Sequence, residues 1–148
     1  MVATDMDGLD QGKQALGGAR HGPGCTVVTG VLIAESLRVG SLLQDLPLRV
    51  DEISRIDAGD VDAGQPRTWT FIHFEAPVGD ADGLAAALSS GLQRRGGWYC
   101  NFRSGDDTFI VFADAVFRYP RGDTVRRAEA EDFARSCGVP EPQLDWEE

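Results

Sequence analysis

Three side chains in this sequence are of the types that catalysis uses most often. His73 and Glu75 lie two residues apart, and Cys100 follows a Trp-Tyr pair. A histidine beside a carboxylate can act as a general base, and a cysteine becomes a nucleophile when its thiol loses its proton. One hypothesis is therefore a small enzyme that uses His73 with a nearby carboxylate such as Glu75, or Cys100 as the nucleophile.

Other signals of catalysis and of metal binding are missing from the sequence. The chain has 2 histidines and no Gly-rich phosphate loop. Its 3 cysteines are far apart and form no CxxC pair, which argues against zinc and against a disulfide framework. Asp57, Asp60 and Asp62 suggest calcium, but the Gly and Glu of an EF-hand loop do not fall in register. We expect no cofactor and no metal, and favour a non-catalytic protein.

The run that carries His73 is predicted to be a strand over residues 68–76. Side chains two residues apart in a strand point to the same face, so His73 and Glu75 should share one face. The same face takes Trp69 and Phe71, and the other takes Thr70, Ile72 and Phe74.

Three short strands with two tight turns are predicted over residues 98–123. Trp98, Cys100 and Phe102 alternate with Tyr99, Asn101 and Arg103, so one set should be buried and the other should face water. Residues 108–112 are aromatic or β-branched and show little alternation, which is typical of a strand covered on both faces. Residues 116–119 form the third strand, which ends before a proline.

Two earlier segments leave the type of element open. Alternating β-branched residues favour a strand over 26–38, although 31–38 could also form a helix. Residues 48–56 fit a strand with a slip near Asp51 and Glu52. The three-residue spacing of the apolar positions in that segment keeps a helix open there as well.

Two helices complete the predicted fold. The first runs from Asp80 to Arg95, and the second follows Asp123, which should cap it, and ends before Gly138. The result is an α+β domain: a single, mostly antiparallel sheet of five to six strands in the order β-β-β-α-β-β-β-α, with both helices on one face. Residues 26–148 would form this domain, and residues 1–25, rich in Gly and Asp, a disordered arm.

The charge of the chain restricts its partners. The formal net charge is −10, which disfavours nucleic acid and favours a basic protein partner. The acids are dense near the C-terminus, where Arg135 is the single cation from Glu129 to Glu148. No apolar run is long enough to cross a membrane, and no secretory signal is recognisable, so we expect a cytoplasmic protein without membrane contact.

Four segments from Gly97 onward form a recognisable pattern: Trp-Tyr-Cys-Asn-Phe at 98–102, Ile-Val-Phe at 110–112, Val-Phe-Arg at 116–118 and Gly-Val-Pro-Glu-Pro-Gln-Leu-Asp-Trp at 138–146. In these segments the chain resembles a family of small standalone bacterial proteins. Asn101 stands where the family pattern often has Asp. The resemblance implies a bacterial cytosolic domain and transfers no catalytic residue.

These observations favour a cytosolic interaction module with an acidic surface. An inhibitor of the immunity or antitoxin kind is one form that such a protein could take. Two helices on one face would leave the opposite face of the sheet open, and a homodimer through that face is part of the hypothesis. We also expect Trp146 to be buried and to dock the C-terminal segment.

Overall fold

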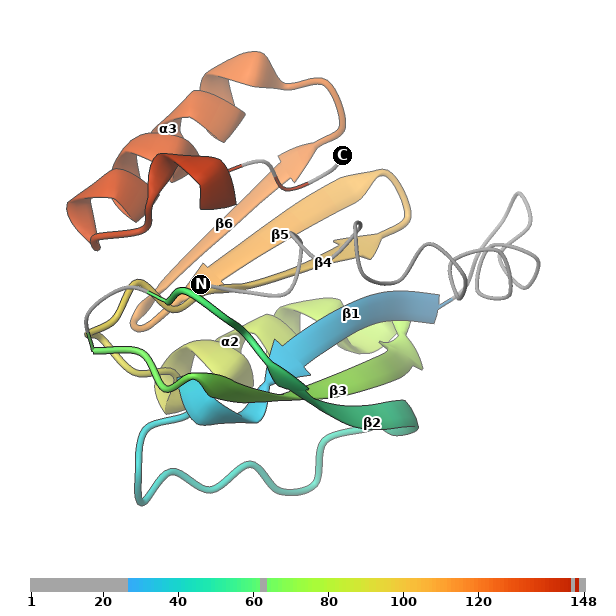
Figure 1. The fold of residues 1–148 in the computed structure, drawn as a ribbon. Helices are drawn as coiled ribbons and strands as arrows, with labels where there is room; N and C mark the ends of the chain where they lie inside the picture. The colour runs from blue at the N-terminus through green and yellow to red at the C-terminus, as the bar shows by residue number, and fades with distance from the viewer. Residues whose placement is uncertain (1–26, 62–63, 145, 147–148) are drawn as a thin grey trace.

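The computed structural model describes residues 27–61, 64–144 and 146. They form one α+β fold around an open sheet of six strands, in which every pair of neighbours is antiparallel. The order across the sheet is β2-β3-β1-β4-β5-β6 (Figure 1). The strands are β1 (Val27–Ile33), β2 (Arg49–Asp57), β3 (Thr68–Pro77), β4 (Cys100–Ser104), β5 (Asp107–Phe112) and β6 (Ala115–Pro120). The predicted arm at residues 1–25 lies outside the described residues.

Two α-helices follow the third and the sixth strand, which confirms the predicted element order. They are α2 (Ala81–Gly91) and α3 (Thr124–Ser136). Single turns of 3-10 helix lie at η3 (Ala34–Ser36), η4 (Val78–Asp80) and η5 (Glu141–Gln143). Within the described ranges, no helix combines the length and the apolar character that a membrane crossing requires.

Both ambiguous segments contain strands. β2 pairs with β3 along its length, and the register shifts between Val50 and Glu52, where the slip was predicted. This bulge puts Val50 and Ile53 on the same face, because they pair with residues 74 and 72 of β3. β1 ends at Ile33 and gives way to the turn η3, whose Ser36 hydroxyl donates to the Ile33 carbonyl at 2.5 Å.

Gly30 makes room for an aromatic row on one face of the sheet. It pairs with Phe74 on one side and with Phe102 on the other. A Cβ added at Gly30 would lie 2.6 Å from the end of the Phe74 ring, so the ring occupies the space that a side chain would need. Phe102 in turn stacks on Phe109 at 4.8 Å. A glycine within a strand often marks a bulge. Here Gly30 instead lets the apolar core continue across β1, and the register through it is unbroken.

The two helices lie on opposite faces of the sheet, so the prediction that both pack on one face is wrong (Figure 1). The neighbouring β6 residues Phe117 and Arg118 show this, because successive side chains of a strand point to opposite faces. Phe117 contacts Phe133 of α3, with ring centroids 5.3 Å apart. Arg118 instead reaches Asp82 of α2 at 3.0 Å. Neither face is wholly open, which removes the geometric basis for a homodimer through an uncovered face.

The sequence predicted the ends of α3 correctly and the C-terminal end of α2 incorrectly. Asp123 caps α3 as expected, accepting from the Arg126 amide at 3.0 Å, and Gly138 takes a positive φ just beyond the helix. α2 ends at Gly91, four residues before the predicted end at Arg95. The reason is tertiary: Leu92 forms a β-bridge with Leu37 and so leaves the helical path.

Candidate functional site

His73 and Glu75 lie on the same face of β3, as the sequence predicted. The His73 ring contacts Phe71, with centroids 6.4 Å apart. Glu75 forms an ion pair with Arg49 of β2 at 2.9 Å, and the Glu75 side chain is 15% exposed. Within the described part of the chain, His73 has no hydrogen bond to a carboxylate, so the two residues share a face without forming a catalytic pair.

Sequence reasoning missed the two β2 residues that face this pair. The register places Glu52 opposite His73 and Arg49 opposite Glu75. The carboxylate nearest to His73 in the register is therefore on a neighbouring strand rather than two residues along the chain. The suspected slip near Asp51 was the only sequence signal for these two residues. The slip changes the alternation of side chains along β2, and this alternation decides which β2 residues share the face of His73.

Cys100 lies on the opposite face from His73. Cys100 shares a face with Phe102, which pairs with Gly30, whereas His73 pairs with the next residue, Val31. The Cys100 thiol is fully buried and donates to the Val31 carbonyl at 3.4 Å. This burial raises the pKa of Cys100 to about 12. The thiol is therefore protonated at neutral pH, and the structure does not bring Cys100 together with His73 and Glu75.

Metal-ligating side chains do not gather in the described residues. No group of three or more His, Cys, Asp or Glu side chains there has an arrangement that could hold a metal ion. In the loop where the sequence suggested calcium, Asp57 instead accepts from the Gly59 amide at 2.9 Å and pairs with Arg67 at 2.8 Å. The Arg67 guanidinium holds the pKa of Asp57 below its ordinary value. Asp62 of the same loop lies outside the described residues.

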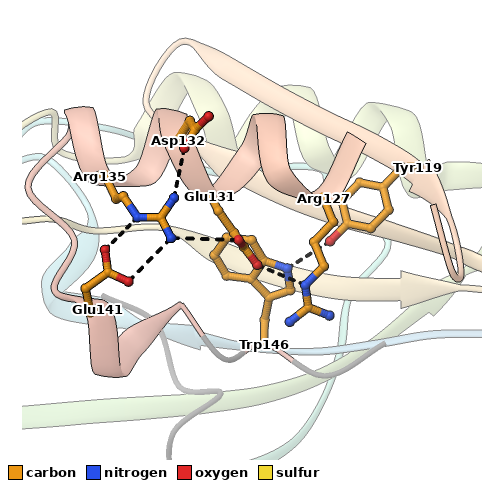
Figure 2. Close-up of polar contacts among 7 residues, drawn as sticks. All are labelled: Tyr119, Arg127, Glu131, Asp132, Arg135, Glu141 and Trp146. Atoms are coloured by element: carbon orange, nitrogen blue, oxygen red, sulfur yellow. Dashed lines mark hydrogen bonds and ion pairs between the residues drawn. The ribbon is translucent and has the colours of Figure 1, made fainter. Parts of the chain in front are cut away.

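An acidic cluster forms where α3 meets the C-terminal segment, and Figure 2 shows its contacts. Arg135 of α3 pairs with Glu141 of η5 at 2.5 Å and with Asp132 at 2.8 Å. Its third partner is Glu131, which also accepts from Arg127 at 3.0 Å. We call this the α3–C-terminal surface, defined by Arg127, Glu129, Glu131, Asp132, Arg135 and Glu141. Its four carboxylates outnumber its two arginines, so it stays negative after pairing.

Most of the acids on this surface are open to solvent. The side chains of Asp132 and Glu141 are 77% and 69% exposed, and Glu129 is exposed as well. The hydrogen bond from Arg135 holds the pKa of Glu141 below its ordinary value, so this group is ionised at neutral pH. The further acids that flank Trp146 in the sequence lie outside the described residues.

Trp146 attaches the end of the chain to the sheet on the same side as α3 (Figure 2). Its side chain is fully buried, as predicted, and its indole N–H donates to the Tyr119 hydroxyl at 2.8 Å. Tyr99 packs edge-on against the indole and donates to the Gln143 carbonyl at 2.5 Å. Tyr99 was expected to face water, and it is buried because the C-terminal segment covers it. These contacts fix the position of η5 and of Glu141.

Comparisons with protein-family models, with curated proteins and with solved structures found no match. The resemblance that begins at Gly97 therefore stays a prediction.

Proposed function

We propose that this protein is a non-catalytic interaction module that binds a basic protein in the bacterial cytoplasm through its α3–C-terminal surface. The observation that carries the proposal is the arrangement of Glu131, Asp132 and Glu141 around Arg135, which leaves the surface acidic and largely exposed. Because Trp146 and α3 are packed on the sheet, the carboxylates are presented in a fixed arrangement rather than on a free tail.

Such a surface suits a partner with clustered Lys or Arg side chains. Complementary charge speeds the encounter of two proteins and suppresses wrong partners. Arginine in the partner could bind an exposed carboxylate such as Asp132 or Glu129 in a bidentate fashion. The net charge of −10 acts in the same direction over a longer range and repels nucleic acid. An inhibitor of a basic effector protein fits this chemistry.

The enzyme hypothesis has less support from the geometry. His73 has Phe71 as its ring neighbour, and the Glu75 carboxylate is engaged by Arg49. Cys100 is on the other face and stays protonated at neutral pH because burial raises its pKa to about 12. The candidates therefore do not form a nucleophile with an adjacent base, which is the arrangement that this chemistry needs.

The test is capture of partners from the native bacterial lysate at low salt, with the full chain as bait. The variant Glu129→Gln/Asp132→Asn removes two exposed charges from the α3–C-terminal surface. The matched control Asp45→Asn/Asp60→Asn removes two exposed charges elsewhere. We expect a basic protein to be retained by the wild type and by the control, and to be lost with the first variant and at high salt. Retention of the same protein by all three baits, or no capture at low salt, would contradict the proposal.

A further inference from the structure

The strand β1 enters the sheet beside an acidic area that faces the same side as α3. A row of paired residues runs across the sheet from Glu75 of β3 through Thr29, Arg103 and Thr108 to Tyr119 of β6. Paired residues of neighbouring strands point to the same face, and Tyr119 is on the face that carries α3 and the C-terminal segment. Glu75 is therefore on that face too, at the end of the row that is farther from α3 (Figure 1).

We call the area around Glu75 the acidic sheet face, defined by Arg49, Asp51, Glu52, His73 and Glu75. Arg49 pairs with Asp51 at 2.8 Å and with Glu75 at 2.9 Å, and Glu52 stands opposite His73. Of the two described α-helices, α3 is the one on this side of the sheet, and it packs on β5 and β6. Three carboxylates against one arginine leave the face negative, so it suits a cationic segment.

The sequence just before β1, which lies outside the described residues, predicts a reversal of the chain. In Gly22-Pro23-Gly24-Cys25 the proline and the second glycine occupy the two central positions that a type II turn favours for them. After such a turn, residues 19–21 run back in the direction of β1. Both neighbours of β1 in the sheet are already present, as β3 and β4. The returning residues therefore cannot pair beside β1 and must lie over one face of the sheet.

The face that carries α2 has no room for these residues at the start of β1. Val28 and its partner Ala76 are 0% and 2% exposed, and Ala81, the first residue of α2, is 4% exposed. Buried side chains thus fill this face, whereas the opposite face is polar at the same level. The returning residues should lie on the polar side, over the acidic sheet face.

The length of the returning segment brings a cation to this face. Two residues of return from the turn, about 7 Å of extended chain, place Arg20 level with Val27. The long Arg20 side chain then spans the two residues that remain to Glu75, the partner of Thr29. Arg20 and Lys13 are the arginine and the lysine of residues 1–26, and Arg20 is the one near enough to β1 to reach Glu75.

We propose that residues 20–26 of this chain fold back over the acidic sheet face and that Arg20 pairs with Glu75 there. Composition alone makes residues 1–25 an arm, and the proposal places the last part of that arm on the sheet. It goes beyond the proposed function, because it assigns the sheet face beside His73 to the chain itself. The α3–C-terminal surface, on α3 and η5, remains available to another partner.

The test is zero-length cross-linking of the full chain that carries Arg20→Lys, with a carbodiimide that joins a lysine amine to a touching carboxylate. Peptide mass spectrometry should find residue 20 joined to Glu75 or Glu52 in a product with the mass of one chain. Native Lys13 is the internal control and should not form these links. Adding Gly24→Val should reduce the yield several-fold, because valine disfavours the positive φ of the turn. Adding Gly18→Val, outside the turn, should leave the yield unchanged.

Three results would overturn the proposal in variants that keep the wild-type circular dichroism. The first is no link from residue 20 to the acidic sheet face, or links spread evenly over carboxylates of the whole chain. The second is an equal yield with Gly24→Val and with Gly18→Val. The third is a link found only in products with twice the mass, which would assign the face to a second copy. The experiment needs no partner, so its failure is distinct from a failure of the lysate capture.

Discussion

At the scale of single residues, the burial of Cys100 decides how its thiol reacts. Burial raises its pKa to about 12, so at pH 8 the thiolate is scarce and the sulfur is also out of reach of solvent. We predict that iodoacetamide leaves Cys100 unmodified in the native protein and modifies it in the unfolded protein, as measured by mass spectrometry. Partly exposed Cys137 is the internal control and should react in the native state. Equal labelling of Cys100 in both states would show that it is accessible and would revive the nucleophile hypothesis.

Gly30 is a second residue at which a substitution should change the free energy of unfolding. Gly30→Ala would place a methyl group 2.6 Å from the Phe74 ring and should lower the free energy of unfolding by about 1–3 kcal/mol, the usual cost of overpacking. Urea denaturation measures the change.

The matched control for this substitution is Gly83→Ala, because nothing lies within 4 Å of a Cβ at Gly83 and the residue is inside α2. There, alanine should stabilise the protein by about 0.5–1 kcal/mol through helix propensity. The double variant Gly30→Ala/Phe74→Leu should recover part of the loss, since the shorter side chain vacates the contested space. Equal effects of alanine at both glycines would contradict the account of the aromatic row.

At the scale of elements, the C-terminal segment is attached mainly through one side chain. Trp146→Ala removes a fully buried aromatic side chain together with the hydrogen bond that its indole N–H donates to the Tyr119 hydroxyl. We predict a loss of about 3 kcal/mol in the free energy of unfolding, typical of a packed aromatic. Trp146→Phe keeps much of the packing and should cost less. An unchanged denaturation midpoint for Trp146→Ala would mean that the segment contributes nothing to the fold.

The elements themselves were largely predictable, because their signals are local. Short runs of sequence were enough to predict the alternation of β3, the slip in β2 and the Asp123 cap. The structure confirms each of these predictions. The face on which each helix packs is not a local property. An apolar stripe shows that a helix is buried, but it does not say on which side of the sheet.

The candidate site was predictable in part for the same reason. His73 and Glu75 share a face because they are two residues apart in one strand. Cys100 could not be placed relative to them, because β1, early in the chain, lies between β3 and β4 in the sheet. That insertion is a long-range pairing that no local pattern encodes. The cover that buries Tyr99 likewise comes from a segment more than forty residues later.

At the scale of the whole molecule, acidity should weaken the ion pairs that attach η5 to α3. Arg135 lowers the pKa of Glu141 below its ordinary value of 4.5. A carboxyl whose folded pKa is lowered stabilises the fold above the unfolded pKa and loses this effect as the pH falls through the folded pKa. We predict that Glu141→Gln melts at a lower temperature than the wild type at pH 7, that the difference shrinks as the pH falls below 4.5, and that it disappears below the folded pKa of Glu141. A difference that persists in acid would assign the effect to something other than the charge of Glu141.

The central claim is that the α3–C-terminal surface binds a basic protein. The most direct measurement is amide hydrogen exchange of the full chain, alone and in complex with the captured partner. The account predicts added protection in α3 and in residues 139–144, at low salt, and none in that region for Glu129→Gln/Asp132→Asn under the same conditions. Protection confined to other parts of the chain, with α3 and residues 139–144 exchanging as they do in the free protein, would contradict it.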